Sequence, residues 1–183
     1  MRKIVPQLFE LLVDRPDGTP PAYRRASAFS VSRLLTEESK NREECLNILL
    51  PRIHQPFMTP KQELLSTAEC ISTLQTILVN TDPSPALLST LLTPIVPALY
   101  AILGCLESKK TAEPALKESV KGLLGTWSRI VSAQEVEEVC WGIIEGEGGY
   151  WKVDIAGEII QTARYFIRCM SLDGGLTSAP LQA

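Results

Sequence analysis

Acidic residues and glycines crowd together in the segment EGEGGYWKVD, which runs from Glu145 to Asp154. Such a segment could form a phosphate-binding loop, a metal-binding loop or a pair of catalytic carboxylates. It lacks the G-x-x-x-x-G-K-[ST] and G-x-G-x-x-G patterns of nucleotide-binding loops, and no predicted strand precedes it. It also lacks the D-x-[DN]-x-[DN]-G spacing of a calcium loop. The sequence therefore predicts no phosphate or calcium site here.

A carboxylate pair is the remaining chemical possibility. A glycosidase-like pair needs two carboxyl groups held at a defined separation across a pocket. No part of the sequence predicts such a pocket around the acidic residues of this region, so we interpret them as solvated turn residues. They are Glu145, Glu147, Asp154 and Glu158.

The glycines themselves predict a sharp turn. Gly146, Gly148 and Gly149 follow a predicted helix and can take left-handed backbone conformations that other residues avoid. We expect the chain to reverse there, Trp151 to fold back as an anchor, and Asp154 to begin the next helix. The segment is then a structural turn between two helices.

Histidine chemistry rests on one residue, because His54 is the only histidine in the chain. A Ser/His/Asp or Cys/His arrangement would need it as the base, and a histidine metal site would need further ligands. His54 lies between Pro51 and Pro56, which suggests a helix end and not an active site. The sequence thus predicts no enzyme, no catalytic residue, no cofactor and no metal.

The cysteines carry no motif. Their number is odd, they are widely spaced, and no Cys-x-x-Cys pattern occurs, so zinc ribbons and disulfide frameworks lack their signature. Apolar neighbours predict buried free thiols in a reducing compartment. The residues are Cys45, Cys70, Cys105, Cys140 and Cys169.

Negative charge gathers in one region of the chain. Between Ser132 and Glu158 there are seven carboxylates against Lys152 alone, although the whole chain has a formal charge of only −3. The region can be an acidic patch that binds a basic protein partner, or merely a solvated face. The patch residues are Glu135, Glu137, Glu138, Glu145 and Glu147. The overall charge gives no attraction to nucleic acid.

Helices must position these residues, because apolar side chains recur at helical spacing and no segment keeps a strand alternation. Thr59-Pro60, Ser84-Pro85 and the capping box from Ser132 to Glu135 predict helix starts. About eight helices are predicted, near 2–13, 22–36, 41–56, 60–79, 85–106, 114–131, 133–145 and 154–170.

Taken in pairs, these helices repeat about every 40 residues, as in the two-helix repeats of HEAT and armadillo proteins. We therefore expect an all-α fold, an α-solenoid of antiparallel hairpins over residues 1–170, followed by a flexible tail at 171–183.

One long segment, from Pro83 to Leu106, carries no charge and is long enough to cross a membrane. Pro94 and Pro97 interrupt it, and its hydroxyl residues dilute its apolar character. A buried solenoid helix is the favoured interpretation of residues 85–106, and a membrane span stays open.

Two stretches carry a resemblance to a known family: DPSPALLSTLLTPIVPALYAIL, and LKESVKGLLGTWSRIV running on to CWGIIEGEGGYWKVDIAGEI. Over residues 40–165, and most distinctively from Trp127 to Asp154, the chain resembles the fungal HEAT-repeat family required for nuclear transport and assembly of RNA polymerase II. The animal relatives of that family are transport-and-Golgi-organisation proteins.

The resemblance implies a non-enzymatic scaffold or adaptor whose partners are RNA polymerase II subunits or nuclear import factors. It implies a cytoplasmic protein that shuttles to the nucleus. The animal branch implies an alternative, a membrane-associated factor in protein secretion and Golgi organisation. Members of the family are much longer, so the chain resembles an internal piece of a longer solenoid.

Overall fold

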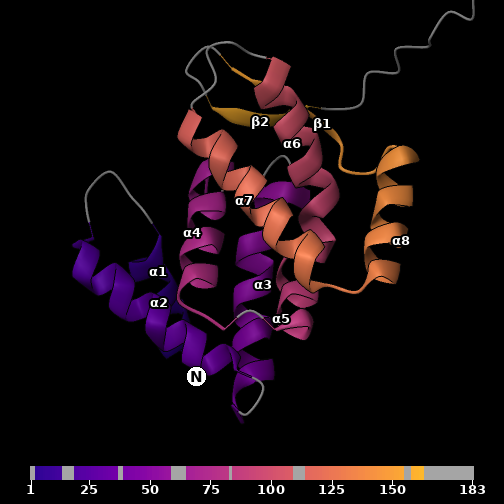
Figure 1. Ribbon diagram of the computed structural model, residues 1–183. Coiled ribbons are helices and arrows are strands. Elements are labelled where there is room, and N and C mark those ends of the chain that lie inside the picture. Colours follow the sequence, from indigo (N-terminus) through magenta and orange to yellow (C-terminus); the bar gives the residue numbers. More distant parts are fainter. Residues whose placement is uncertain are drawn as a thin grey trace, which may run out of the picture.

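The computed structural model describes residues 3–13, 19–36, 39–58, 65–82, 84–108, 114–154 and 158–162. These residues form a mostly helical protein with one small β-hairpin (Figure 1). The helices are α1 (Ile4–Leu12), α2 (Pro21–Leu35), α3 (Arg42–Met58), α4 (Thr67–Val79), α5 (Pro85–Leu91), the 3-10 helix η1 (Thr93–Ile95), α6 (Val96–Ser108), α7 (Pro114–Ile130) and α8 (Ala133–Ile144). The strands are β1 (Tyr150–Val153) and β2 (Ile159–Thr162).

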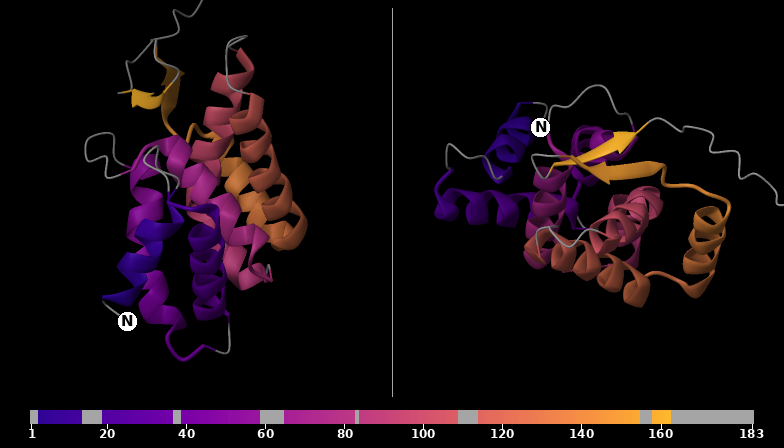
Figure 2. Two further views of the ribbon diagram at one scale, coloured as in Figure 1. Left: turned by 90° about the vertical axis from the view of Figure 1, so that its left-hand side faces the viewer. Right: turned by 90° about the horizontal axis from the view of Figure 1, so that it is seen from above.

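The apolar core lies between α3, α4, α5 and α6, where side chains such as Leu49, Ile53, Leu74, Leu88 and Leu99 are completely buried. Helices α1 and α2 contact each other at one side of this core, and α8 stands at the opposite side (Figures 1 and 2). Helix α6 contacts α7, α8 and β1, so it joins the core to the region between Ser132 and Glu158, in which carboxylates far outnumber basic residues.

Arg24 joins three helices near the α1 end of the molecule. Its Nε donates to the carbonyl of Leu12 at 3.2 Å, and its Nη2 donates to the hydroxyls of Ser72 and Thr76 at 2.8 and 3.3 Å. These bonds satisfy the last turn of α1 and tie α2 to α4.

Two predicted helix starts can be compared with the structure. Helix α4 begins at Thr67, not near residue 60, because Ser66 and Glu69 form a reciprocal capping box there. Thr59-Pro60 lies outside the described residues. The Ser84 start is confirmed, since its hydroxyl accepts from the Leu87 N–H at 3.2 Å.

The helix predicted over 85–106 is interrupted. Helix α5 ends at Leu91, η1 follows, and α6 then runs to Ser108. Pro94 and Pro97 lack the N–H groups that a continuous helix would use, so the chain tightens locally into the 3-10 turn. The stretch Pro85–Ser108 is nonetheless long and apolar enough to cross a membrane by composition, and half of its most apolar window is buried inside the protein.

The helix predicted over 154–170 is wrong where the structure describes it, because residues 159–162 form β2. This strand pairs antiparallel with β1, with Tyr150 opposite Thr162 and Val153 opposite Ile159. Asp154 forms the connection instead of starting a helix, since its N–H donates to the Glu158 carbonyl and its Oδ1 accepts from the Glu158 N–H. Residues 163–183, including the predicted tail, lie outside the described residues.

Candidate functional site

The glycine turn after α8 has the left-handed conformations that its composition predicts. The φ angles of Gly146, Gly148 and Gly149 are +93°, +98° and +73°. The turn sits against α6, because a Cβ on Gly148 would lie 2.2 Å from the carbonyl oxygen of Pro97. Trp151 folds back and donates from Nε1 to the Gly148 carbonyl at 2.7 Å. The turn leads into β1 and not into the expected helix.

The ring of Trp151 also reaches α3, where its centroid lies 6.4 Å from that of Phe57. The turn thereby connects α8, α6 and α3. The neighbouring Glu145 and Glu147 are exposed. Among the residues that the structure describes, no group of three or more His, Cys, Asp or Glu side chains could hold a metal ion.

His54 lies inside α3 and not at a helix end, since the helix continues to Met58 despite Pro51 and Pro56. Its Nε2 donates to the Leu91 carbonyl at 2.8 Å, at the end of α5. Burial lowers the pKa of His54, and the hydrogen bond to Leu91 acts in the opposite direction. The imidazole therefore links α3 to α5 in its neutral form at neutral pH.

This burial makes folding sensitive to pH. Unfolded His54 takes up a proton near pH 6.5 while the folded imidazole resists protonation, so its contribution is complete above that pH and falls as the pH drops below it. We expect the urea midpoint of the native chain to fall more than that of His54→Gln between about pH 7.5 and about pH 5.5. Identical pH dependence of the two proteins would contradict this expectation.

The described cysteines are not equally buried. Burial raises the pKa of Cys45 to about 11, and burial together with the charge of Glu69 raises that of Cys70 to about 12. Cys105 is half-buried. The expectation of burial is wrong for Cys140, which is exposed because, among the described elements, α8 packs chiefly on α6. Cys169 lies outside the described residues.

Glu135 does not belong to an exposed acidic patch. Its carboxylate accepts hydrogen bonds from the hydroxyls of Ser89, at 2.7 Å, and Thr93. Trp127 donates from Nε1 to the Thr93 hydroxyl at 2.9 Å, so the network connects α8 to α5, η1 and α7. Ser132 still caps α8 by accepting from the Glu135 N–H, but the Glu135 side chain does not complete the predicted capping box.

The other four patch residues remain on the surface. Glu137 and Glu138 lie on α8, and Glu145 and Glu147 follow its end. All four are exposed, and Glu138 accepts a bond from Gln134 at 3.0 Å. The structure therefore leaves four of the five predicted patch residues exposed, two on α8 and two directly after it, and excludes Glu135.

An apolar groove lies beside this surface, between α7 and α8, with a volume of about 440 Å³. Helix α6 supplies Val96 and Tyr100. Ile144, which lines the groove, is 71% exposed, and Trp141 of α8, which does not line it, is 58% exposed. The side chains from the two walls are apolar or small. They are Leu124, Gly125, Trp127 and Ser128 from α7, and Val136, Cys140, Ile143 and Ile144 from α8.

Sequence reasoning missed this groove. The available signal is the spacing of Val136, Cys140 and Ile143 on one face of α8, together with the small residues Gly125 and Ser128 on α7. Neither pattern indicates by itself that the two helices face each other.

Comparisons of this chain with protein-family models, curated proteins and solved structures find no match.

Proposed function

We propose that this protein is a non-enzymatic helical-repeat scaffold or adaptor that acts in RNA polymerase II assembly and nuclear import. The observation that carries the scaffold role is the open apolar groove between α7 and α8, which exposed Ile144 lines. Contiguous exposed apolar surface bordered by charge is typical of protein interaction sites. The polymerase and import assignment comes from the sequence resemblance over residues 40–165.

The proposal includes an α-solenoid architecture. Successive helices contact each other in the pairs α1 with α2, α3 with α4, and α6 with α7, as stacked hairpins require. Helices at both sides expose large side chains: 60% of Tyr23 and of Phe29 on α2, and Trp141 and Ile144 on α8. Such faces suit contacts with further repeats or with partners.

Affinity purification of the tagged chain from its own cells, followed by mass spectrometry, tests this function. We expect RNA polymerase II subunits or nuclear import factors in the soluble eluate. Their recovery should decrease with a Glu137→Lys/Glu138→Lys variant, whose folding can be checked by circular dichroism, because both carboxylates are exposed on α8. Absence of all polymerase and import proteins from the native eluate would contradict the assignment.

One observation favours a second function, that of a membrane-associated factor in protein secretion and Golgi organisation. The stretch Pro85–Ser108 has a mean hydropathy of 1.9 over its most apolar window. Against a span, η1 interrupts the stretch, and Ser89 and Thr93 within it bind the carboxylate of Glu135. Carbonate washing of membranes separates the two functions, because a spanning protein stays in the pellet and an adaptor is released.

A further inference from the structure

We propose that the groove between α7 and α8 binds an amphipathic helix of a partner protein, with its apolar stripe in the groove and lysine or arginine side chains facing α8. This inference rests on the proposed scaffold function and adds the binding surface and the chemistry of the partner.

Helix α8 is incompletely covered by the part of the chain that the structure describes. Among the residues of α8, all of which the structure describes, only Gly142 is buried. Val136, Val139 and Ile143 are half-buried, and Ile144 is exposed. A helix that leaves this much of its apolar face accessible has room for another apolar element beside it.

The walls of the groove are helices. Helices α7 and α8 form its walls and α6 contributes Val96 and Tyr100, as in helix-in-groove recognition. On α8 the groove runs from Val136 to Ile144, which is about 12 Å or somewhat more than two turns. A partner helix of similar length would place apolar residues at i, i+3, i+4 and i+7 along it.

Gly125 leaves open space at the wall of the groove. Nothing within 4 Å would meet a Cβ on Gly125, and the same is true of Gly122 on the same helix, so the position of Gly125 in the groove is what distinguishes it. The residue lines the groove on α7, where the absent side chain would let the backbone of a docked helix approach closely.

Charge selects the partner. Helix α8 has no basic residue, and Glu137 and Glu138 are exposed on it. By helical periodicity Glu137 lies on the same side as the groove residues Cys140 and Ile144, whereas Glu138 lies on the outer side. Basic side chains beside the apolar stripe of the partner would therefore meet Glu137 first.

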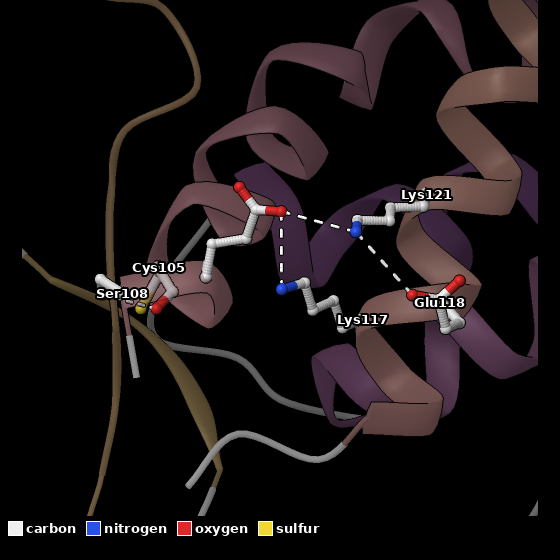
Figure 3. A network of polar contacts seen from close by, with 6 residues as sticks. Cys105, Ser108, Lys117, Glu118 and Lys121 are labelled. Carbon is white, nitrogen blue, oxygen red and sulfur yellow. Dashed lines mark hydrogen bonds and ion pairs between the residues drawn. The ribbon is translucent and has the colours of Figure 1, made fainter. Parts of the chain in front are cut away.

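Helix α7 differs because its lysines are already paired. Lys117 and Lys121 both approach the carboxylate of Glu107, on α6, at 3.5 and 3.6 Å, and Lys121 lies 3.8 Å from Glu118 (Figure 3). The negative charge of α8 has no such compensation from basic residues of the same helix. The basic flank of the partner should thus point to α8 and not to α7.

The test uses two synthetic helical peptides of about 18 residues, long enough for five turns, with the same leucine stripe and either lysine or glutamate on the flanks. Binding is measured by alkylation of Cys140 with a maleimide in the full chain carrying Cys105→Ser and Cys169→Ser. Cys45 and Cys70 are buried with raised pKa values, so they react slowly. We expect the lysine peptide at saturation to slow alkylation about fivefold or more, and the glutamate peptide to have little effect.

Variants then localise the effect. Gly125→Leu should fill the groove and abolish protection while keeping the fold, because the added side chain meets nothing within 4 Å at its Cβ and leucine favours helix. Glu137→Lys should weaken the lysine peptide about tenfold, and the matched variant Glu138→Lys, on the outer side of α8, should weaken it less. If both peptides protect Cys140 equally, or if Glu137→Lys and Glu138→Lys weaken the lysine peptide equally, the proposal of a basic partner is wrong.

Other occupants give different results. Residues 163–170, with the sequence ARYFIRCM, are apolar with two arginines. If Cys140 reacts slowly without peptide and becomes faster in Arg164→Glu/Arg168→Glu, the chain's own segment occupies the groove and the partner proposal is wrong. If Cys140 becomes slower as protein concentration rises, a second copy occupies it, with the same consequence.

The inference and the proposed function can fail separately. Suppose that the Gly125→Leu variant still retains polymerase or import proteins and that the lysine peptide does not protect Cys140 of the native chain from alkylation. Helix binding in the groove would then be wrong, and the adaptor function would be unaffected. Suppose instead that the lysine peptide protects Cys140 from alkylation but the native eluate contains no polymerase or import proteins. Helix binding in the groove would then be supported, and the assigned function would be wrong.

Discussion

A Gly148→Ala variant is expected to lose about 3 kcal/mol of its free energy of unfolding, because two costs combine at this position. The φ angle of +98° is strained for any residue with a Cβ. The new Cβ would also lie 2.2 Å from the Pro97 carbonyl oxygen and 3.0 Å from the Ala98 nitrogen. These are backbone atoms of α6 and cannot move aside as a flexible side chain would. Urea unfolding followed by circular dichroism measures the loss.

Gly122→Ala is the matched control for this variant. Gly122 lies inside α7, and nothing within 4 Å would meet its Cβ, so alanine should raise the free energy of unfolding by up to about 1 kcal/mol. If Gly148→Ala and Gly122→Ala unfold at the same urea concentration, the glycine turn is not seated on α6 as the structure describes.

The conformation of the glycine turn could be predicted from the sequence alone, but its contact with α6 could not. Its left-handed conformations were predictable because they follow from local composition, as three glycines after an apolar helix leave few alternatives. Its contact with Pro97 was not predictable, because the two segments are about fifty residues apart in the chain. The predicted backbone conformation of the turn was therefore correct, but only the structure shows that the turn packs against α6.

The error over 154–170 has a similar origin. YWKV and IIQT are rich in aromatic and β-branched residues, which favour strands, but four residues are too few for a clear alternation. Each strand is defined by its pairing with the other and, for β1, by its contact with α6. The patch prediction failed at Glu135 for the same reason, since Ser89 and Thr93 are distant in sequence.

Glu135→Ala is expected to lose about 2 kcal/mol of the free energy of unfolding, because it removes hydrogen bonds from two hydroxyls to a carboxylate. The loss is smaller than the sum of two buried bonds, since Ser89 and Thr93 are half-exposed and can turn to water. Helix α8 is otherwise held by its contact with α6 and by half-buried Val136, Val139 and Ile143, and its only buried residue among those described is Gly142. Hydrogen exchange of the α8 amides should therefore become faster in the variant, while that of α3 stays unchanged.

Glu138→Ala is the control that distinguishes loss of the Glu135 hydrogen bonds from loss of one negative charge on α8. Glu138 is exposed on the same helix and accepts a hydrogen bond from Gln134, so its removal should change the free energy of unfolding by less than about 0.5 kcal/mol. A double-mutant cycle of Glu135→Ala with Ser89→Ala should show a coupling of about 0.5 kcal/mol or more. Equal losses in the two glutamate variants, or no coupling, would mean that Glu135 contributes to α8 only as one surface charge among several. A measurable coupling energy between Glu135 and Ser89 would show that Glu135 attaches α8 to the rest of the protein. The exposed carboxylates, above all Glu137, would then be the ones available to a basic partner.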